Sequence, residues 1–167
     1  ADKHVIRYSP DDQIVLPHLL AHEIEHLRME HAARQAGANR LFRSSAAGRE
    51  YAIRSMGKDV TRLQKMGYSD SSISDVVIEL VNNLLRQLHS TPLDMIVERR
   101  LYDDLPALRQ DQLVSLDVTN QRSLRILSMP QVQRATPPFI YDASAILNAA
   151  YALFIDELSG GRTAFAQ

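Results

Sequence analysis

The sequence predicts a mostly α domain of the α+β class, in which a helical body follows a short N-terminal strand or hairpin. Three observations predict it. The chain has 167 residues, of which 45% are hydrophobic, which suits one domain with a core. β-branched and aromatic residues gather at 4–8 (HVIRY), before a turn cluster at 9–12 and a second candidate strand at 13–16. Beyond that point, apolar residues recur at helical spacing between capping residues.

The first helix is expected to begin at Pro17 and to end at Gly37, because proline suits a first helical turn and glycine a C-terminal cap. A second helix is expected over 50–66, where Gly67 ends it. The next is expected to start near Ser72 or Ser74 and to run to about residue 88, because Ser72 and Asp75 have the spacing of a capping box.

Thr91, Pro92 and Asp94 have the pattern of a new helix start, which predicts a separate helix to about residue 102. A helix is also expected over 106–127. The three prolines of 128–138 favour a loop there. The last helix is expected over 140–158, where an apolar stripe ends before two glycines.

Composition excludes several classes of function. Lysine and arginine total 19 and aspartate and glutamate total 20, so the net charge of -1 argues against nucleic acid as a partner. The absence of cysteine excludes disulfides, cysteine–zinc sites and thiol nucleophiles. No uninterrupted apolar run approaches 18 residues, so no membrane span is expected. The compartment stays open, with the cytoplasm favoured.

The main functional motif is His22-Glu23-Ile24-Glu25-His26, an H-E-x-x-H sequence within a predicted helix. Residues four apart share a helix face, so both imidazoles can bind one ion. Glu23 is placed to reach a metal-bound water and take its proton. Zinc in such sites takes two histidines and a third protein ligand and keeps one position for water.

Neighbouring polar residues compete with this interpretation. His18 lies four residues before His22 and forms a second pair at the same spacing. It lacks an adjacent glutamate, so we interpret it as a residue behind the ligands or on the surface. His31 faces elsewhere. Glu25 and Glu30 are most simply solvated, and surface histidines on a polar helix are the plain alternative to a metal site.

The third ligand must come from another helix. Asp94, Glu98 and Tyr102 share one face by their spacing of four, and a carboxylate from this face would complete a His/His/Glu site. Glu79, in the apolar stretch 76–85, is the second candidate ligand. The alternative is an acidic face that pairs with nearby arginines.

The motif HEIEH and a downstream helical glutamate resemble the gluzincin branch of zinc metallopeptidases. The run PLDMIVERRLYDDLPALR resembles a second block of uncharacterised bacterial HExxH proteins. This resemblance implies a zincin-like fold, with Zn²⁺ bound by His22, His26 and Glu98 and with Glu23 as general base. It also implies that Asp94 supports the ligands. Tyr102 is a candidate for stabilising the oxyanion.

Only 21 residues precede His22, so at most two short strands fit before the motif. We therefore expect residues 1–167 to form a single minimal zincin-like domain, or to be a fragment of a longer protein with further domains. The expected function is zinc-dependent hydrolysis of a peptide or protein substrate. A strand at 4–8 would be suited to pair with an extended substrate.

Two other classes of function are open. The domain could be a non-catalytic zinc-binding or scaffold module derived from a zincin. A di-iron carboxylate bundle is the third possibility, because Glu23 and His26 form one E-x-x-H half-site. No second glutamate is followed by histidine at the third position, which disfavours that class.

Overall fold

The computed structural model describes residues 5–6, 15–38 and 45–161, without the side chain of residue 49. The described residues form helices and no strand, so the protein is all-α and the predicted α+β, zincin-like fold class is wrong. Of the predicted hairpin, Val5 and Ile6 have no regular structure, Val15 and Leu16 lie at the start of a helix instead of in a second strand, and the rest lies outside the described residues. Val5 is 78% exposed, so burial does not stabilise an extended backbone there.

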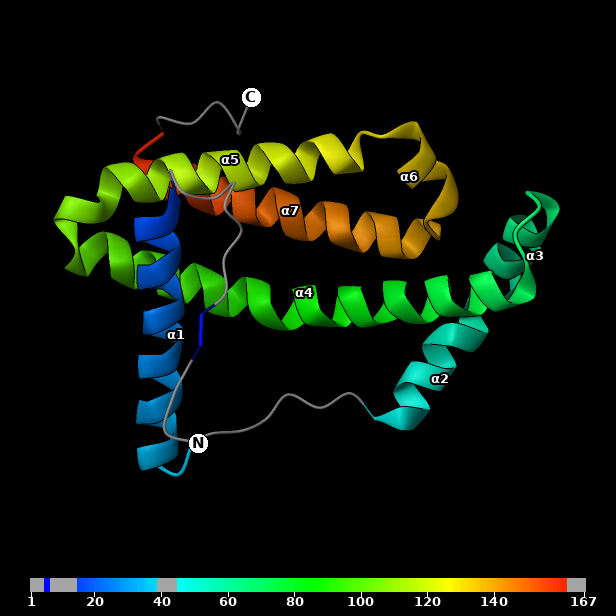
Figure 1. Cartoon of the computed structure of the whole chain (residues 1–167), viewed down its shortest axis with the longest axis horizontal. Coiled ribbons are helices and arrows are strands. Elements are labelled where there is room, and N and C mark those ends of the chain that lie inside the picture. Colours follow the sequence, from blue (N-terminus) through cyan, green and yellow to red (C-terminus); the bar gives the residue numbers. More distant parts are fainter. Residues whose placement is uncertain (1–4, 7–14, 39–44, 162–167) are drawn as a thin grey trace. The chain divides into compact units, whose positions relative to one another are not determined.

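Figure 1 shows the helices in chain order. Their bounds are α1 (Leu16–Gln35), α2 (Ala46–Ser55), α3 (Gly57–Lys65), α4 (Asp70–Asp104), the 3₁₀ helix η2 (Pro106–Leu108), α5 (Arg109–Leu127), α6 (Pro130–Ala135) and α7 (Pro138–Ser159).

Helix α1 ends as its sequence predicts. Gly37 has a φ of 63°, which favours glycine because a side chain would be strained there. The Gly37 N–H donates to the carbonyl of Arg34 at 3.1 Å, and the Ala38 N–H donates to that of Ala33 at 2.8 Å. These two bonds are the pair that closes a helix with a left-handed glycine.

Three predicted boundaries are wrong. The segment 50–66 is two helices, α2 and α3, which meet at the fully buried Met56. Helix α4 begins at Asp70, and the Ser69 hydroxyl accepts the N–H of Ser72, so the cap lies three residues before the predicted one. Helix α4 also continues through Pro92, although proline cannot donate to the preceding turn. In addition, residues 130–135 form α6 rather than loop.

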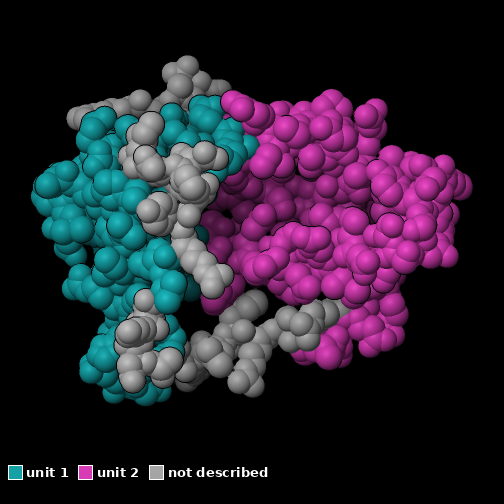
Figure 2. All heavy atoms as spheres, viewed as in Figure 1, with its two compact units in different colours: residues 1–41, 92–122, 151–167 teal, residues 42–91, 123–150 magenta. Residues whose placement is uncertain are grey.

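The described chain falls into two compact units, drawn in different colours in Figure 2. Unit 1 takes residues 1–41, 92–122 and 151–167. Its apolar core is built from α4, α5 and α7, where Ile155 is fully buried. The core residues are Leu116, Phe154, Ile155 and Leu158, with Met95, Tyr102 and Tyr151 packed against them.

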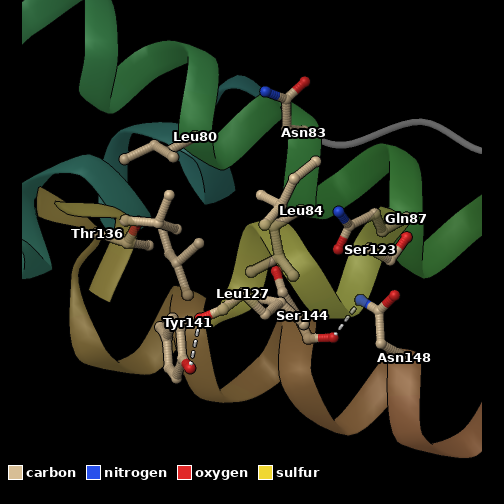
Figure 3. A pocket seen from close by; sticks show the side chains of 13 residues that line it. Leu80, Asn83, Leu84, Gln87, Ser123, Leu127, Thr136, Tyr141, Ser144 and Asn148 are labelled. Carbon is tan, nitrogen blue, oxygen red and sulfur yellow. Dashed lines mark hydrogen bonds between the residues drawn. The ribbon is translucent and has the colours of Figure 1, made fainter. Parts of the chain in front are cut away.

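Unit 2 takes residues 42–91 and 123–150. Its core lies around Met56 and continues along α3, the first part of α4 and the start of α7. A pocket of about 250 Å³ opens in this unit, and Figure 3 shows its wall. Tyr141 donates to the carbonyl of Leu127 at 3.0 Å there. Apart from this phenol, the lining residues carry no titratable side chain, so they offer no metal-binding cluster.

Helix α7 is the one described helix that is long and apolar enough to cross a membrane by length and composition. Only 17% of its apolar window is buried. Phe139, Ile146 and Leu153 are exposed along it, whereas Ile140 and Ile155 belong to the cores of the two units. The sequence-based expectation of no membrane span therefore stays a prediction.

Candidate metal centre

Three histidines and two carboxylates come together in unit 1. His18, His22 and His26 lie four residues apart on α1 and so share one face of that helix. This face contacts Asp94 and Glu98, which lie four apart on the part of α4 that belongs to unit 1. The spacing predicted from the sequence on each helix is thus realised in one cluster of five side chains.

The outer half of the cluster is a triangle of three atoms. Nε2 of His26 lies 3.1 Å from Nε2 of His22 and 3.0 Å from Oδ1 of Asp94. Nε2 of His22 lies 3.6 Å from the same carboxylate oxygen. The three side chains are 16%, 29% and 27% exposed, in the order His22, His26 and Asp94, so solvent reaches this half.

The inner half of the cluster is centred on Glu98, which is 1% exposed. Nδ1 of His22 donates to its Oε1 at 2.7 Å, and Nε2 of His18 donates to its Oε2 at 2.9 Å. The amide of Gln112 donates at 2.6 Å to Oε2 and at 2.8 Å to the main-chain carbonyl of Glu98. A buried carboxylate needs such donors to remain ionised.

These contacts change the pKa values of two groups. Burial by itself would lower the pKa of His22, but hydrogen bonds to Asp94 and Glu98 and their negative charges raise it from 6.5 to about 9. Burial would raise the pKa of Glu98, but hydrogen bonds from His18, His22 and Gln112 lower it from 4.5 to about 2. In the metal-free protein, His22 and Glu98 thus form an ion pair at neutral pH.

Glu25 fixes α1 to α4 beside the cluster. The sequence-based interpretation of Glu25 as solvated is wrong, because the residue is only 8% exposed. Its carboxylate pairs with Arg100 of α4 at 3.2 Å and with Arg28 of its own helix at 3.3 Å. Glu30 pairs with Arg34 on the same helix.

Glu23, the predicted general base, is exposed and forms no hydrogen bond or ion pair with another described residue. Tyr102 packs in the core of unit 1, and its ring lies 4.7 Å from the guanidinium of Arg109. Glu79, the second candidate for the third ligand, is exposed and belongs to unit 2. The five-residue cluster does not include these three residues.

The sequence left His18 either behind the ligands or on the surface, and it did not mark Gln112. His18 is 2% exposed and reaches Glu98, and the available signal was its spacing of four from His22. Gln112 is fully buried, yet no motif or spacing in the sequence marks it. Only the packing of α5 against α4 brings its amide to Glu98.

Two groups within the described residues bring three ligand atoms within 4.8 Å of one another: His18, His22 and Glu98, and His22, His26 and Asp94. Compared with protein-family models, curated proteins and solved structures, the chain has no significant match.

Proposed function

We propose that this protein is a zinc-dependent hydrolase whose metal ligands are Nε2 of His22, Nε2 of His26 and a carboxylate oxygen of Asp94. The single observation that carries the proposal is the triangle of these atoms, with separations of 3.0, 3.1 and 3.6 Å. Two imidazole nitrogens and a carboxylate oxygen are a donor set that suits zinc.

The size of the triangle fits the ion. In a tetrahedral zinc site with bonds of about 2.0–2.1 Å, neighbouring ligand atoms lie about 3.3 Å apart. The three separations lie on either side of that value. In the metal-free protein, the Nε2–H of protonated His22 can be shared between Nε2 of His26 and Oδ1 of Asp94, and a cation would take its place.

The exposure of the ligands favours a catalytic site over a closed structural one. Each of the three side chains keeps 16–29% of its surface accessible, so water can reach a fourth position on the ion. A structural zinc site would surround the ion with four protein ligands. Within the described residues, no fourth ligand joins this triangle.

Bound zinc would lower the pKa of a coordinated water toward about 7 and polarise a substrate carbonyl. Asp94, His22 and His26 hold the ion, and Glu98 holds His22. Glu23 follows His22 directly, and its carboxylate has no described partner, so it is free to accept the proton of the attacking water. This is acyl-transfer chemistry with a peptide carbonyl as the electrophile.

The choice of a peptide substrate rests on the resemblance of the HEIEH motif to gluzincins. The alternative function is a non-catalytic zinc-binding module. The exposed ligands favour the hydrolase, and metal content measured together with hydrolysis separates the two functions.

The test combines metal content and hydrolysis. Purified protein is loaded with zinc, desalted and assayed by elemental analysis, and then incubated with unfolded casein and a mixed fluorogenic peptide library. We expect one zinc per chain, lost in His26→Ala and Asp94→Ala. Glu23→Gln should keep zinc and lose hydrolysis. His31→Ala is the matched control, because His31 is an exposed histidine on the same helix.

Three results would change the proposal. A wild-type protein that takes up no zinc contradicts it. Zinc binding without cleavage of any peptide favours the non-catalytic module. Hydrolysis that survives Glu23→Gln removes Glu23 as the base and leaves the metal ligands in place.

A further inference from the structure

We propose that Glu98 is a positioning residue, held by His18 and Gln112, that fixes which nitrogen of His22 binds the metal. This inference rests on the proposed metal site and adds the arrangement behind it. The neutral imidazole carries one N–H, so a proton held on Nδ1 leaves the lone pair on Nε2. Glu98 accepts a hydrogen bond from the N–H at Nδ1, which leaves Nε2 of His22 available to bind the ion.

The distances around Glu98 are hydrogen-bond distances. Its oxygens lie 2.7 Å from His22, 2.9 and 3.1 Å from His18, and 2.6 Å from Gln112. A charged donor–acceptor pair of this kind lies about 2.7–2.9 Å apart. Two ligands of one tetrahedral zinc ion lie farther apart, at about 3.3 Å. The contacts of Glu98 with His22 and Gln112 are also shorter than every separation in the outer triangle, so the group formed by His18, His22 and Glu98 suits shared protons better than a metal ion.

The hydrogen-bond donors also occupy the lone pairs of the Glu98 carboxylate. An ionised carboxylate has about four lone-pair sites. Four contacts from His18, His22 and Gln112 reach the two oxygens of Glu98. A metal bond to Glu98 would require at least one of these buried donors to lose its partner, which is costly away from water.

The support behind Glu98 restricts its movement. Gln112 donates both to the side chain of Glu98 and to its main-chain carbonyl, so one amide bridges the backbone and the carboxylate. His18, Glu98 and Gln112 are 2%, 1% and 0% exposed. Because the carboxylate is enclosed and cannot exchange these partners for water, it stays directed at Nδ1 of His22.

The assignment exchanges the roles that the sequence-based resemblance gave to two carboxylates. In that expectation, Glu98 binds zinc and Asp94 supports the ligands. The geometry favours the reverse, because Asp94 lies 3.0 Å from Nε2 of His26 and is 27% exposed, whereas Glu98 is enclosed. Carboxylates that hydrogen-bond the far nitrogen of a metal-bound histidine orient the ring and raise its basicity.

The experiment identifies the metal-bound atoms directly. Full-length protein labelled with ¹⁵N is loaded with ¹¹³Cd²⁺ in place of zinc, and cadmium–nitrogen couplings are measured by NMR. We expect couplings to Nε2 of both His22 and His26, and a hydrogen-bonded proton on Nδ1 of His22. The His26 coupling serves as an internal reference for an intact site.

Variants separate positioning from ligation. Glu98→Ala should weaken zinc binding about 10–100-fold, the usual effect of losing a carboxylate behind a metal-bound histidine. The absorption spectrum of bound Co²⁺ should stay that of wild type. Glu98→Gln should recover part of the affinity, because its amide oxygen can still accept from Nδ1 of His22. Asp94→Ala should change the Co²⁺ spectrum. Gln112→Ala gives a milder variant if Glu98→Ala does not fold.

The possible failures are distinguishable. Coupling of ¹¹³Cd to Nδ1 of His22, or a Co²⁺ spectrum that changes in both Glu98 variants as it does in Asp94→Ala, overturns the positioning role and leaves a metal site. If wild-type protein binds neither Cd²⁺ nor Zn²⁺, the proposed function and this inference fail together.

Discussion

Asp94 and Glu98 lie one helical turn apart on α4 and face the same helix, yet their surroundings differ. Asp94 is 27% exposed and contacts Nε2 of His26. Glu98 is 1% exposed and accepts hydrogen bonds from three side chains. By their sequence spacing alone the two carboxylates are equivalent, and the packing of α5 against α4 gives them different surroundings.

Replacement of Gln112 should lower the stability of the folded protein. In Gln112→Leu, the carboxylate of Glu98 and its main-chain carbonyl lose a buried donor. We expect the free energy of unfolding to fall by about 1–3 kcal/mol. Urea denaturation followed by circular dichroism measures it. Gln110→Leu, at an exposed position on the same helix, is the control and should change little.

The stability of the metal-free protein should depend on pH on both sides of a maximum. Glu98, with its pKa lowered from 4.5 to about 2, contributes stability that is present above pH 4.5 and is lost as the pH falls through 2. His22, with its pKa raised from 6.5 to about 9, contributes stability that is present below pH 6.5 and is lost as the pH rises through 9.

We therefore expect these two groups to contribute most between pH 4.5 and 6.5. Denaturation midpoints measured in EDTA from pH 2 to 10 test this. Glu98→Gln should flatten both limbs, because it removes the ion pair. A wild-type stability that does not decline between pH 6.5 and 9 would contradict the pKa assigned to His22.

Zinc should stabilise the folded protein in proportion to its occupancy. A ligand that binds only the native state at 100 times its dissociation constant adds about 2.7 kcal/mol. We expect the melting temperature to rise with added Zn²⁺ and to return to its starting value with EDTA. Asp94→Ala should show no such rise, whereas His31→Ala should respond as wild type does. Equal shifts in all three proteins would indicate binding elsewhere.

The two arginines that contact Glu25 should differ in their energetic coupling to it. Arg100 joins α1 to α4, whereas Arg28 is a neighbour on α1 and is 75% exposed. Double-mutant cycles with alanine should give a coupling of about 1 kcal/mol for Glu25 with Arg100 and under about 0.5 kcal/mol for Glu25 with Arg28. Equal couplings would mean that the contact between the helices adds nothing.

Local features of the fold were predictable from the sequence. The start of α1 near Pro17 and its end at Gly37 follow from residues within one turn of each boundary. The separate helix expected from Thr91 was wrong, since its capping pattern is overridden within a continuous α4. The strand at 4–8 was expected from residue types alone, and a strand also needs a partner that local sequence does not supply.

The sequence predicted which helix faces carry the site, but not the role of each residue on them. The spacing of four brought His22, His26, Asp94 and Glu98 into consideration together. The division of roles between the two carboxylates depends on Gln112 and on burial, and neither has a signature in the sequence. His18 had the right spacing, but its burial could not be read from α1 alone.

The distance in sequence between the partners of the cluster has a consequence for folding. His18 and Glu98 are 80 residues apart, and unit 1 is collected from three separate stretches of chain. Closing such a loop carries an entropy cost that local helices do not have, so contacts of high contact order form late. During synthesis, the cluster and the amide that supports it cannot be complete before Gln112 has left the ribosome. We expect metal capture to follow tertiary folding, and zinc added early in refolding should leave the folding rate unchanged.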